Sequence, residues 1–206
     1  MKRFLVTFAV MALFVGAAVA QEPDFGYYPN EIGLYSTMTP ASAADCYIDA
    51  PGGFGGFPMF LLISNPSDDG TGAPIETIGG YELSIAVPAG WSVSPVLPAG
   101  TTDFDGQPNH FYVSGLIPVV GDFTKLADIT IGSFGGGASG GIFLTPYDNG
   151  AQTIPGFMAI TNADDNFVPS RAYPISGSPD APVAGINLQV VDSEDVSWGD
   201  VKSLFK

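Results

Sequence analysis

Hydrophobic and polar residues alternate most clearly in the stretch YELSIAV, which starts at Tyr81. One set of positions is Tyr81, Leu83, Ile85 and Val87, and the other is Glu82, Ser84 and Ala86. A period of two residues is typical of a β-strand, because its successive side chains point to opposite faces. We therefore predict a strand whose apolar face covers the core, with Glu82, Ser84 and Ala86 directed toward water.

Short apolar or alternating runs recur from Glu31 onward, separated by clusters of Gly, Pro, Asn and Asp. The other predicted strands are 32–35, 57–63, 91–93, 110–116, 126–131, 142–145, 157–161 and 183–191, with a weaker one at 172–175. No long helical pattern interrupts them. Eight to ten short strands predict an all-β fold over residues 31–195, an antiparallel two-sheet sandwich of the jelly-roll or immunoglobulin-like type.

The first twenty residues have the pattern of a cleaved secretory signal. Its parts are the basic pair Lys2 and Arg3, an apolar run at 4–15, and the small residues Ala18 and Ala20. We expect cleavage before Gln21, followed by a lead-in without periodicity at 21–30. The apolar run is too short for a membrane span. The expected product is secreted, extracellular or periplasmic, with no stable membrane insertion after cleavage.

A helix is predicted only at the C-terminus, over residues 196–206. Ser197 and Asp200 have the spacing of a capping box, with Asp in place of the usual Glu or Gln. The apolar residues Trp198, Val201, Leu204 and Phe205 then recur at helical spacing. Because so short a helix is unstable alone, its apolar stripe is expected to dock on the sandwich or on another molecule.

The charge of the chain excludes some partners. The 206 residues include 21 Asp and Glu but six Lys and Arg, for a formal net charge of −15. The basic residues that follow the signal are Lys125, Arg171, Lys202 and Lys206. Nucleic acid needs a basic stripe, which is absent here, and an anionic membrane surface is disfavoured for the same reason. The charge otherwise favours solubility.

Few side chains suit catalysis or redox chemistry. Cys46 and His110 are the only residues of their types, so no intramolecular disulfide forms and zinc, haem and iron–sulfur sites lack ligands. Cys46 is expected to be a small buried hydrophobe. Ser139 lies in a G-x-S-x-G sequence, but no helix pattern follows it, so we expect a chance match rather than a nucleophile. We predict no catalytic residues.

Acidic pairs in predicted loops are the weak candidates for metal ligands. They are Asp68 with Asp69, Asp103 with Asp105, and Asp164 with Asp165. Oxygen ligands on loops suit a structural calcium ion, although none of these pairs has EF-hand spacing. The alternative is that they are solvated turn residues. Two such carboxylates could also serve a glycan hydrolase, if the fold placed them across a cleft.

Aromatic residues offer a possible platform for a sugar or a partner protein. They are Trp91, Phe54, Phe57, Tyr27, Tyr28 and Tyr147. The alternative is that most of them pack in the core or under turns.

Two stretches resemble known proteins. The sequence from Phe60 to Pro66, followed by 79–85 (GGYELSI), is similar to the opening of cohesin-like sandwich modules. That resemblance implies a jelly roll that docks proteins through a flat sheet face. The chain differs from cohesins in reading Val-Pro-Ala-Gly-Trp at 87–91. The tail at 196–205 and the Gly-Leu-Tyr at 33–35 resemble a group of exported bacterial proteins.

These observations together predict a secreted, non-catalytic binding or structural module of the cell surface or extracellular matrix. Its partner would be a protein or a glycan. The alternatives are a carboxylate-based extracellular glycan hydrolase and a calcium-dependent adhesion module. No cofactor other than the possible calcium ion is expected.

Overall fold

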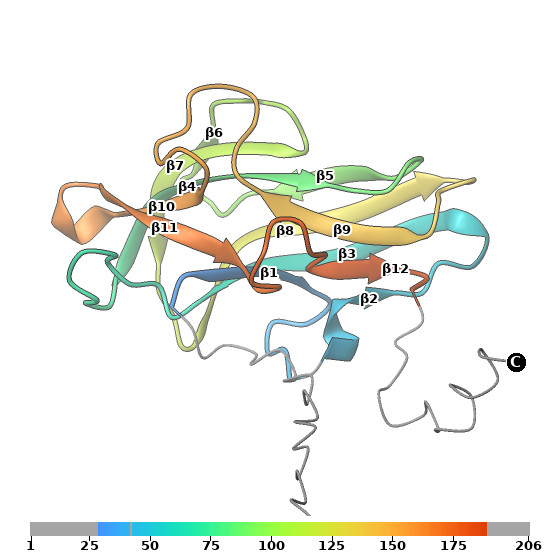
Figure 1. Cartoon of the computed structure of the whole chain (residues 1–206), viewed down its shortest axis with the longest axis horizontal. Coiled ribbons are helices and arrows are strands. Elements are labelled where there is room, and N and C mark those ends of the chain that lie inside the picture. Colours follow the sequence, from blue (N-terminus) through green and yellow to red (C-terminus); the bar gives the residue numbers. More distant parts are fainter. Residues whose placement is uncertain (1–28, 42, 189–206) are drawn as a thin grey trace, which may run out of the picture.

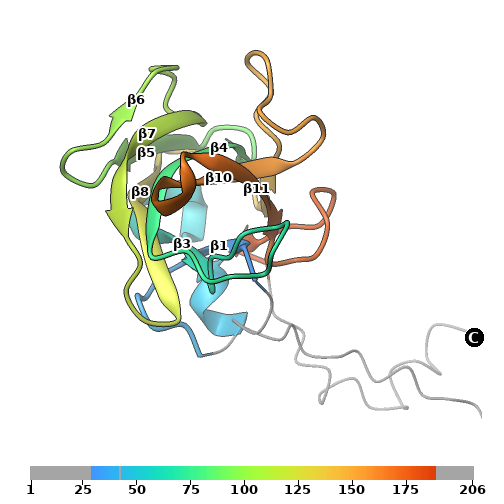
Figure 2. The same cartoon turned by 90° about the vertical axis from the view of Figure 1, so that its left-hand side faces the viewer.

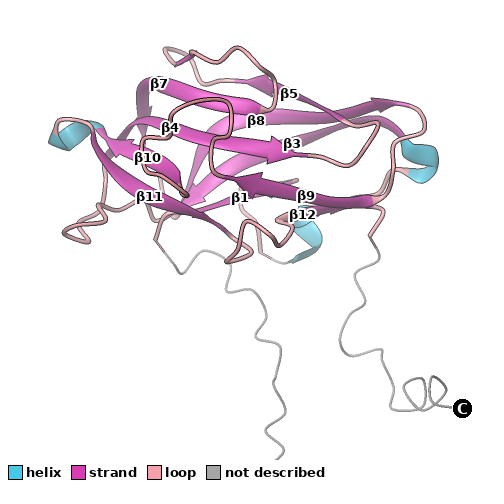
Figure 3. Ribbon diagram, turned by 45° about the horizontal axis from the view of Figure 1, so that its top comes forward, coloured by secondary structure: helices cyan, strands magenta, loops and turns pink. Residues whose placement is uncertain are grey.

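Alternating hydrophobicity produces an all-β structure in the computed structural model, which describes residues 29–41 and 43–188 (Figure 1). The strands are β1 (Glu31–Tyr35), β2 (Tyr47–Ile48), β3 (Phe54–Ser64), β4 (Thr77–Ala86), β5 (Ser92–Val96), β6 (Thr102–Asp103), β7 (His110–Pro118), β8 (Phe123–Phe134), β9 (Gly140–Thr145), β10 (Met158–Asn162), β11 (Val168–Pro174) and β12 (Ala184–Ile186). Three short 3₁₀ turns connect them, η1 (Ala43–Cys46), η2 (Pro51–Gly53) and η3 (Ala163–Asp165) (Figure 3). In these residues no helix has the length and apolar character needed to cross a membrane.

Most of the predicted strands are confirmed, with shifted ends. Two short strands, β2 and β6, carry no hydrophobic pattern of their own and were not predicted. The signal at 1–20 and the helix at 196–206 lie outside the described residues, as do most of the lead-in and the end of the strand predicted at 183–191.

The twelve strands form one hydrogen-bonded sheet. Ten of them follow the order β2-β12-β9-β4-β10-β11-β1-β3-β8-β5. Beside this path, β7 pairs with β4, and β6 pairs with β7. The prediction of a purely antiparallel arrangement is wrong, because β1 pairs in parallel with β11 and β2 pairs in parallel with β12. Parallel neighbours need long connections, and here each pair joins an early strand to a late one. The count of eight to ten strands was also too low.

The sheet curves back around one hydrophobic core. Figure 2 shows β4, β10 and β11 on one side of this interior and β1 and β3 on the other. Side chains from all these strands meet there, including the fully buried Leu34, Leu61, Leu83 and Ile160. One polar contact crosses the core, since the Tyr81 hydroxyl of β4 donates to the Leu126 carbonyl oxygen of β8 at 3.2 Å.

Strand β4 departs from the prediction on its outer face. Glu82 is 3% exposed and Ser84 is 4% exposed, whereas the alternating pattern placed both toward water. The β9–β10 loop, residues 146–157, covers this face and supplies hydrogen-bond partners to both side chains. The pattern identified the strand correctly, but it could not show that a distant loop lies on the polar side.

The core predicts that truncating a buried leucine destabilises the protein much more than truncating an exposed one. Leu61 is fully buried in β3, whereas Leu116 of β7 is 62% exposed. We expect Leu61→Ala to lower the free energy of unfolding by about 2–5 kcal/mol, because it leaves a cavity. Leu116→Ala should change it by about 0.5 kcal/mol or less. Urea denaturation of both variants measures the difference, and equal effects would contradict this description of the core.

Candidate binding groove

Three adjacent strands, β7, β4 and β10, share one outer face of the sheet. Glu82 of β4 lies opposite Tyr112 of β7 on one side and opposite Ala159 of β10 on the other. One step along the strand, Gly80 lies between Ser114 and Thr161 in the same way. Residues directly opposite in antiparallel pairs share a face, so these six positions form a compact patch. Its centre is made of small residues and one carboxylate.

Two glycines make the floor of this patch flat. A side chain at Gly80 would overlap the Val113 carbonyl oxygen, and one at Gly79 would overlap the ring of Phe167. Close approach of backbone and ring therefore requires glycine at both positions. The result is a depression in the middle of the sheet rather than a row of side chains.

A groove of about 290 Å³ lies over this floor. Three aromatic side chains on its lining are unusually open to solvent: Phe104 is 67% exposed, Tyr112 is 44% exposed and Phe167 is 53% exposed. Phe104 and Tyr112 meet edge to face, with ring centroids 6.4 Å apart. β6 and the β9–β10 loop project on the same side of the molecule (Figures 1 and 2).

The position of Phe167 is held at some conformational cost. Its φ is +58° and that of the preceding Asn166 is +49°, both in the left-handed region. Asn tolerates this region, but a bulky aromatic residue rarely occupies it. Such local strain is common at functional sites, and here it places an aromatic ring on Gly79 at the edge of the groove.

Glu82 supplies the polar group of the groove. Its Oε1 accepts a hydrogen bond from the Thr153 backbone N–H at 2.7 Å, and its Oε2 accepts one from the Thr153 hydroxyl at 2.8 Å. These bonds fix the carboxylate and attach the β9–β10 loop to β4. Thr153 also lines the groove, so the loop forms part of its wall.

A second set of contacts holds the beginning of the same loop. Asp105, in the turn between β6 and β7, accepts hydrogen bonds from the Tyr147 hydroxyl at 2.7 Å and from the Asn149 amide at 3.0 Å. Asp148 accepts one from the Ser84 hydroxyl at 2.7 Å. The loop is therefore attached to β4 and to the β6–β7 turn, the two segments that border the groove.

These contacts shift two pKa values. Burial of the Asp105 carboxylate opposes its ionisation, but the hydrogen bonds from Tyr147 and Asn149 outweigh this effect and lower its pKa. The same bond to Asp105, together with burial, raises the pKa of Tyr147 to about 12. Asp105 is thus an anion and Tyr147 a neutral donor across the range of physiological pH.

His110 lies beside this network rather than in a catalytic triad. Its Nε2 is 3.2 Å from Asp148 Oδ1, and its Nδ1 is 3.8 Å from Asp105 Oδ2. Ser84 donates to Asp148 and not to the imidazole. Ser139 is exposed in the loop before β9. A nucleophile elbow needs a helix after the serine, whereas here a strand follows it.

The other acidic candidates accept hydrogen bonds or form ion pairs within the protein. Asp68 Oδ1 accepts from the Thr71 N–H, the Thr71 hydroxyl and the Gly70 N–H, bonds that lower its pKa. Asp69 pairs with Arg171 at 3.5 Å, and Asp164 accepts from the N–H groups at 76 and 77. Within 29–41 and 43–188, no three His, Cys, Asp or Glu side chains converge to hold a metal ion.

Asp103 and Asp165 complete this set of acidic candidates. Asp103 accepts from the Asp105 and Tyr112 N–H groups, and Asp165 lies 3.5 Å from the Asn166 amide. The predicted calcium site stays a prediction for all six residues.

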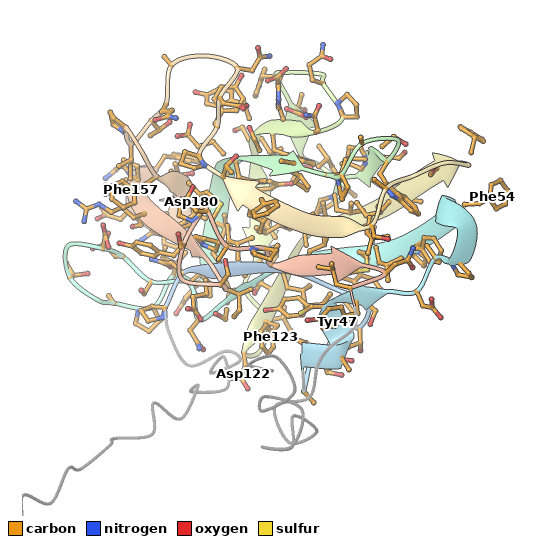
Figure 4. All side chains as sticks on the ribbon, turned by 45° about the vertical axis from the view of Figure 1, so that its right-hand side comes forward. Tyr47, Phe54, Asp122, Phe123, Phe157 and Asp180 are labelled. Atoms are coloured by element: carbon orange, nitrogen blue, oxygen red, sulfur yellow. The ribbon has the colours of Figure 1, made fainter. Side chains whose placement is uncertain are left out.

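Of the aromatic residues singled out in the sequence, those that the structure describes form no common exposed platform, although Tyr147 lies 5.8 Å from the groove residue Tyr112 between ring centroids. Trp91 is buried against Phe57 and donates to the Ala138 carbonyl oxygen, while Phe54 projects at one end of the molecule (Figure 4). Tyr147 is buried in the network under the loop. Tyr27 and Tyr28 lie outside the described residues.

The sequence analysis did not identify the aromatic residues of the groove, although the sequence indicates the exposure of one of them. Tyr112 alternates with the buried Phe111 and Val113, which places it on the outer face of its strand. Phe104 and Phe167 lie in turns, where no periodicity applies.

Cys46 is buried, as predicted. Burial, with a smaller contribution from Asp45, raises the pKa of its thiol to about 12, so it is inert as a nucleophile at neutral pH.

The network under the loop predicts a pH-dependent contribution to stability. Because the folded-state pKa of Asp105 is lowered, its ionisation stabilises the protein above the unfolded value of about 3.9, and this contribution is lost as pH falls through the folded-state pKa. Tyr147→Phe removes one donor. We expect it to destabilise the protein by about 1–2 kcal/mol at neutral pH, with a smaller difference below about pH 4. Thermal unfolding across pH measures this, with Tyr173→Phe as the control; a pH-independent difference would contradict the assignment.

Comparisons of this chain with protein-family models, with curated proteins and with solved structures found no match. The resemblance of residues 60–66 and 79–85 to cohesin-like modules therefore stays a prediction. The groove itself, with its glycine floor, aromatic rim and fixed carboxylate, is the feature from which a function can be inferred.

Proposed function

We propose that this protein is a secreted, non-catalytic binding module that recognises a glycan in the groove over β4. Secretion is inferred from the signal pattern at 1–20. We further propose that the two sides of the curved sheet act as the layers of a sandwich, which gives the groove a rigid base. The observation that carries the proposal is the combination of exposed aromatic rings with a flat glycine floor and a fixed carboxylate.

The chemistry of a sugar ring matches these surfaces. A pyranose has an apolar face of C–H groups that packs on aromatic rings, and hydroxyl groups around its edge that need hydrogen-bond acceptors. Phe104, Tyr112 and Phe167 offer the rings, and Glu82 offers acceptor oxygens. Exposed aromatic residues with one apolar face are otherwise unfavourable in contact with water, so a ligand that covers them gains free energy.

The size of the groove favours a glycan over a protein partner. A volume of about 290 Å³ is at the lower end of small-ligand pockets and suits a group of the size of one sugar ring. A stable protein interface buries about 800 Å² on each partner and is usually broad rather than hollow. The groove is a local depression on one sheet face.

Binding is favoured over hydrolysis by the lining of the groove. Glycosidases generally need two carboxyl groups on opposite sides of the scissile bond. Among the described residues that line the groove, Glu82 is the one with a carboxyl group. Asp103 and Asp105 are adjacent in sequence to Phe104, but their oxygens accept hydrogen bonds within the turn.

Aromatic variants test the location of binding. We expect Tyr112→Ala and Phe104→Ala each to weaken binding by about 3- to 10-fold, since each removes a stacking surface. The measurement is titration calorimetry with neutral oligosaccharides first selected on a glycan array. Phe134→Ala is the matched control, because this residue is fully exposed and lies opposite Phe54 in the β3–β8 pair, at the far end of the sheet.

One result would show that the groove is not the binding site, and another would show that the protein is an enzyme. If Phe134→Ala weakens binding as much as Tyr112→Ala, the groove is not the site. If reducing ends are released from an oligosaccharide and Glu82→Gln abolishes the release, the protein is a hydrolase rather than a binding module.

Glycine variants test the floor of the groove. Gly79→Ala should displace the Phe167 ring and weaken oligosaccharide binding by about tenfold, because the added methyl group occupies the place of that ring. Gly56→Ala is the control, since its methyl group would meet the nearest atom, of Thr130, at an ordinary 3.7 Å. Unchanged affinity in Gly79→Ala, measured by the same calorimetry, would show that Phe167 plays no part in binding.

A further inference from the structure

Glu82 is a buried carboxylate without a cationic partner in the described part of the chain. The ion pairs in these residues are made by Asp69, Asp105, Asp128 and Asp148. Glu82 is 3% exposed, and its two hydrogen bonds both come from the neutral Thr153. Buried charges in proteins are normally paired, because removal from water is costly.

The carboxylate also has acceptor capacity left. Its two oxygens offer about four lone-pair directions, and one bond to each oxygen is made within the protein. Glu82 is among the residues that line the groove, which brings this remaining capacity to the edge of the proposed site. A carboxylate only accepts hydrogen bonds, and it accepts them most strongly from a cationic donor.

The basic residues near this face have contacts with other acidic side chains. Ala159 of β10 lies opposite Glu82 on one side and opposite Arg171 of β11 on the other. The Arg171 guanidinium contacts Asp69 and lies 5.0 Å from the centre of the Phe157 ring. His110 lies between Asp105 and Asp148. No salt bridge to Glu82 is formed by the basic residues within 29–41 and 43–188, and a ligand that carries a cationic group would supply the counter-charge.

We propose that the groove selects glycans with a free amino group, a ring of the hexosamine type whose ammonium group pairs with Glu82 while its apolar face packs on the aromatic rim. This inference rests on the glycan-binding function proposed above and specifies its ligand. The same carboxylate disfavours uronic acids and sulfated sugars, because like charges would be brought together beside Glu82.

The test compares three disaccharides at about pH 6, where an amine is protonated. The probes are a free hexosamine disaccharide, its N-acetylated form and a hexuronate disaccharide, each titrated into the full chain by calorimetry. We expect the free amine to bind about tenfold more tightly than the N-acetylated form, and the hexuronate to bind most weakly. Disaccharides limit the general attraction of a polycation to an acidic protein.

Two variants show whether Glu82 causes this preference. Glu82→Gln keeps the shape and can still bond with Thr153, but it removes the charge; the preference for the amine should fall to about twofold or less. Asp122→Asn makes the same change of net charge in an exposed turn away from β6 and the β9–β10 loop, and it should keep the preference (Figure 4). A thermal melt confirms that each variant is folded.

The outcomes separate this inference from the function on which it rests. If the N-acetylated and free disaccharides bind equally to the native protein, or if Glu82→Gln keeps the tenfold preference, selection by Glu82 is overturned while glycan binding stands. If none of the probes and no neutral oligosaccharide binds, the glycan-binding function itself is overturned. The comparison in the native protein decides the inference even if Glu82→Gln does not fold.

Discussion

The burial of β4 on both faces is the constraint on which the structure depends. One face of the strand contributes Tyr81, Leu83 and Ile85 to the core, and the other is covered by the β9–β10 loop. A polar residue under such a cover needs a partner, because an unpaired buried group is destabilising. Glu82 and Ser84 have theirs in Thr153 and Asp148. The loop is thus held by the side chains that it shields, and its residue Thr153 also lines the groove.

The groove combines rigidity with exposed apolar surface. Its floor belongs to the central part of a hydrogen-bonded sheet, and one wall is attached through Asp105, Ser84 and Glu82. A preformed site loses little conformational entropy when a ligand binds. The rings of Phe104 and Tyr112 meet edge to face at the groove, and neither contributes to the core.

The sequence was sufficient for the strands but not for the site. Period-two patterns such as that of Tyr81 to Val87 follow from local geometry, and they located most of the long strands. The parallel pairing of β1 with β11 depends on contacts between distant segments, which no local pattern contains. The same holds for Glu82: its neighbours in sequence suggest a solvated face, and only the position of Thr153 shows otherwise. Phe167 could not be predicted at all, because its role depends on a left-handed turn and on the absence of a side chain at Gly79.

The pairing of early with late strands has a consequence for how the chain folds. β1 is completed by β11 and β2 by β12, so a chain interrupted before β11 leaves the edge of β1 open. Contacts that span so much sequence give a high contact order, which slows folding. During that delay the unpaired, apolar edge of β1 is prone to intermolecular pairing. The acidic surface of this protein then has a second use, since mutual repulsion between incompletely folded copies opposes their aggregation.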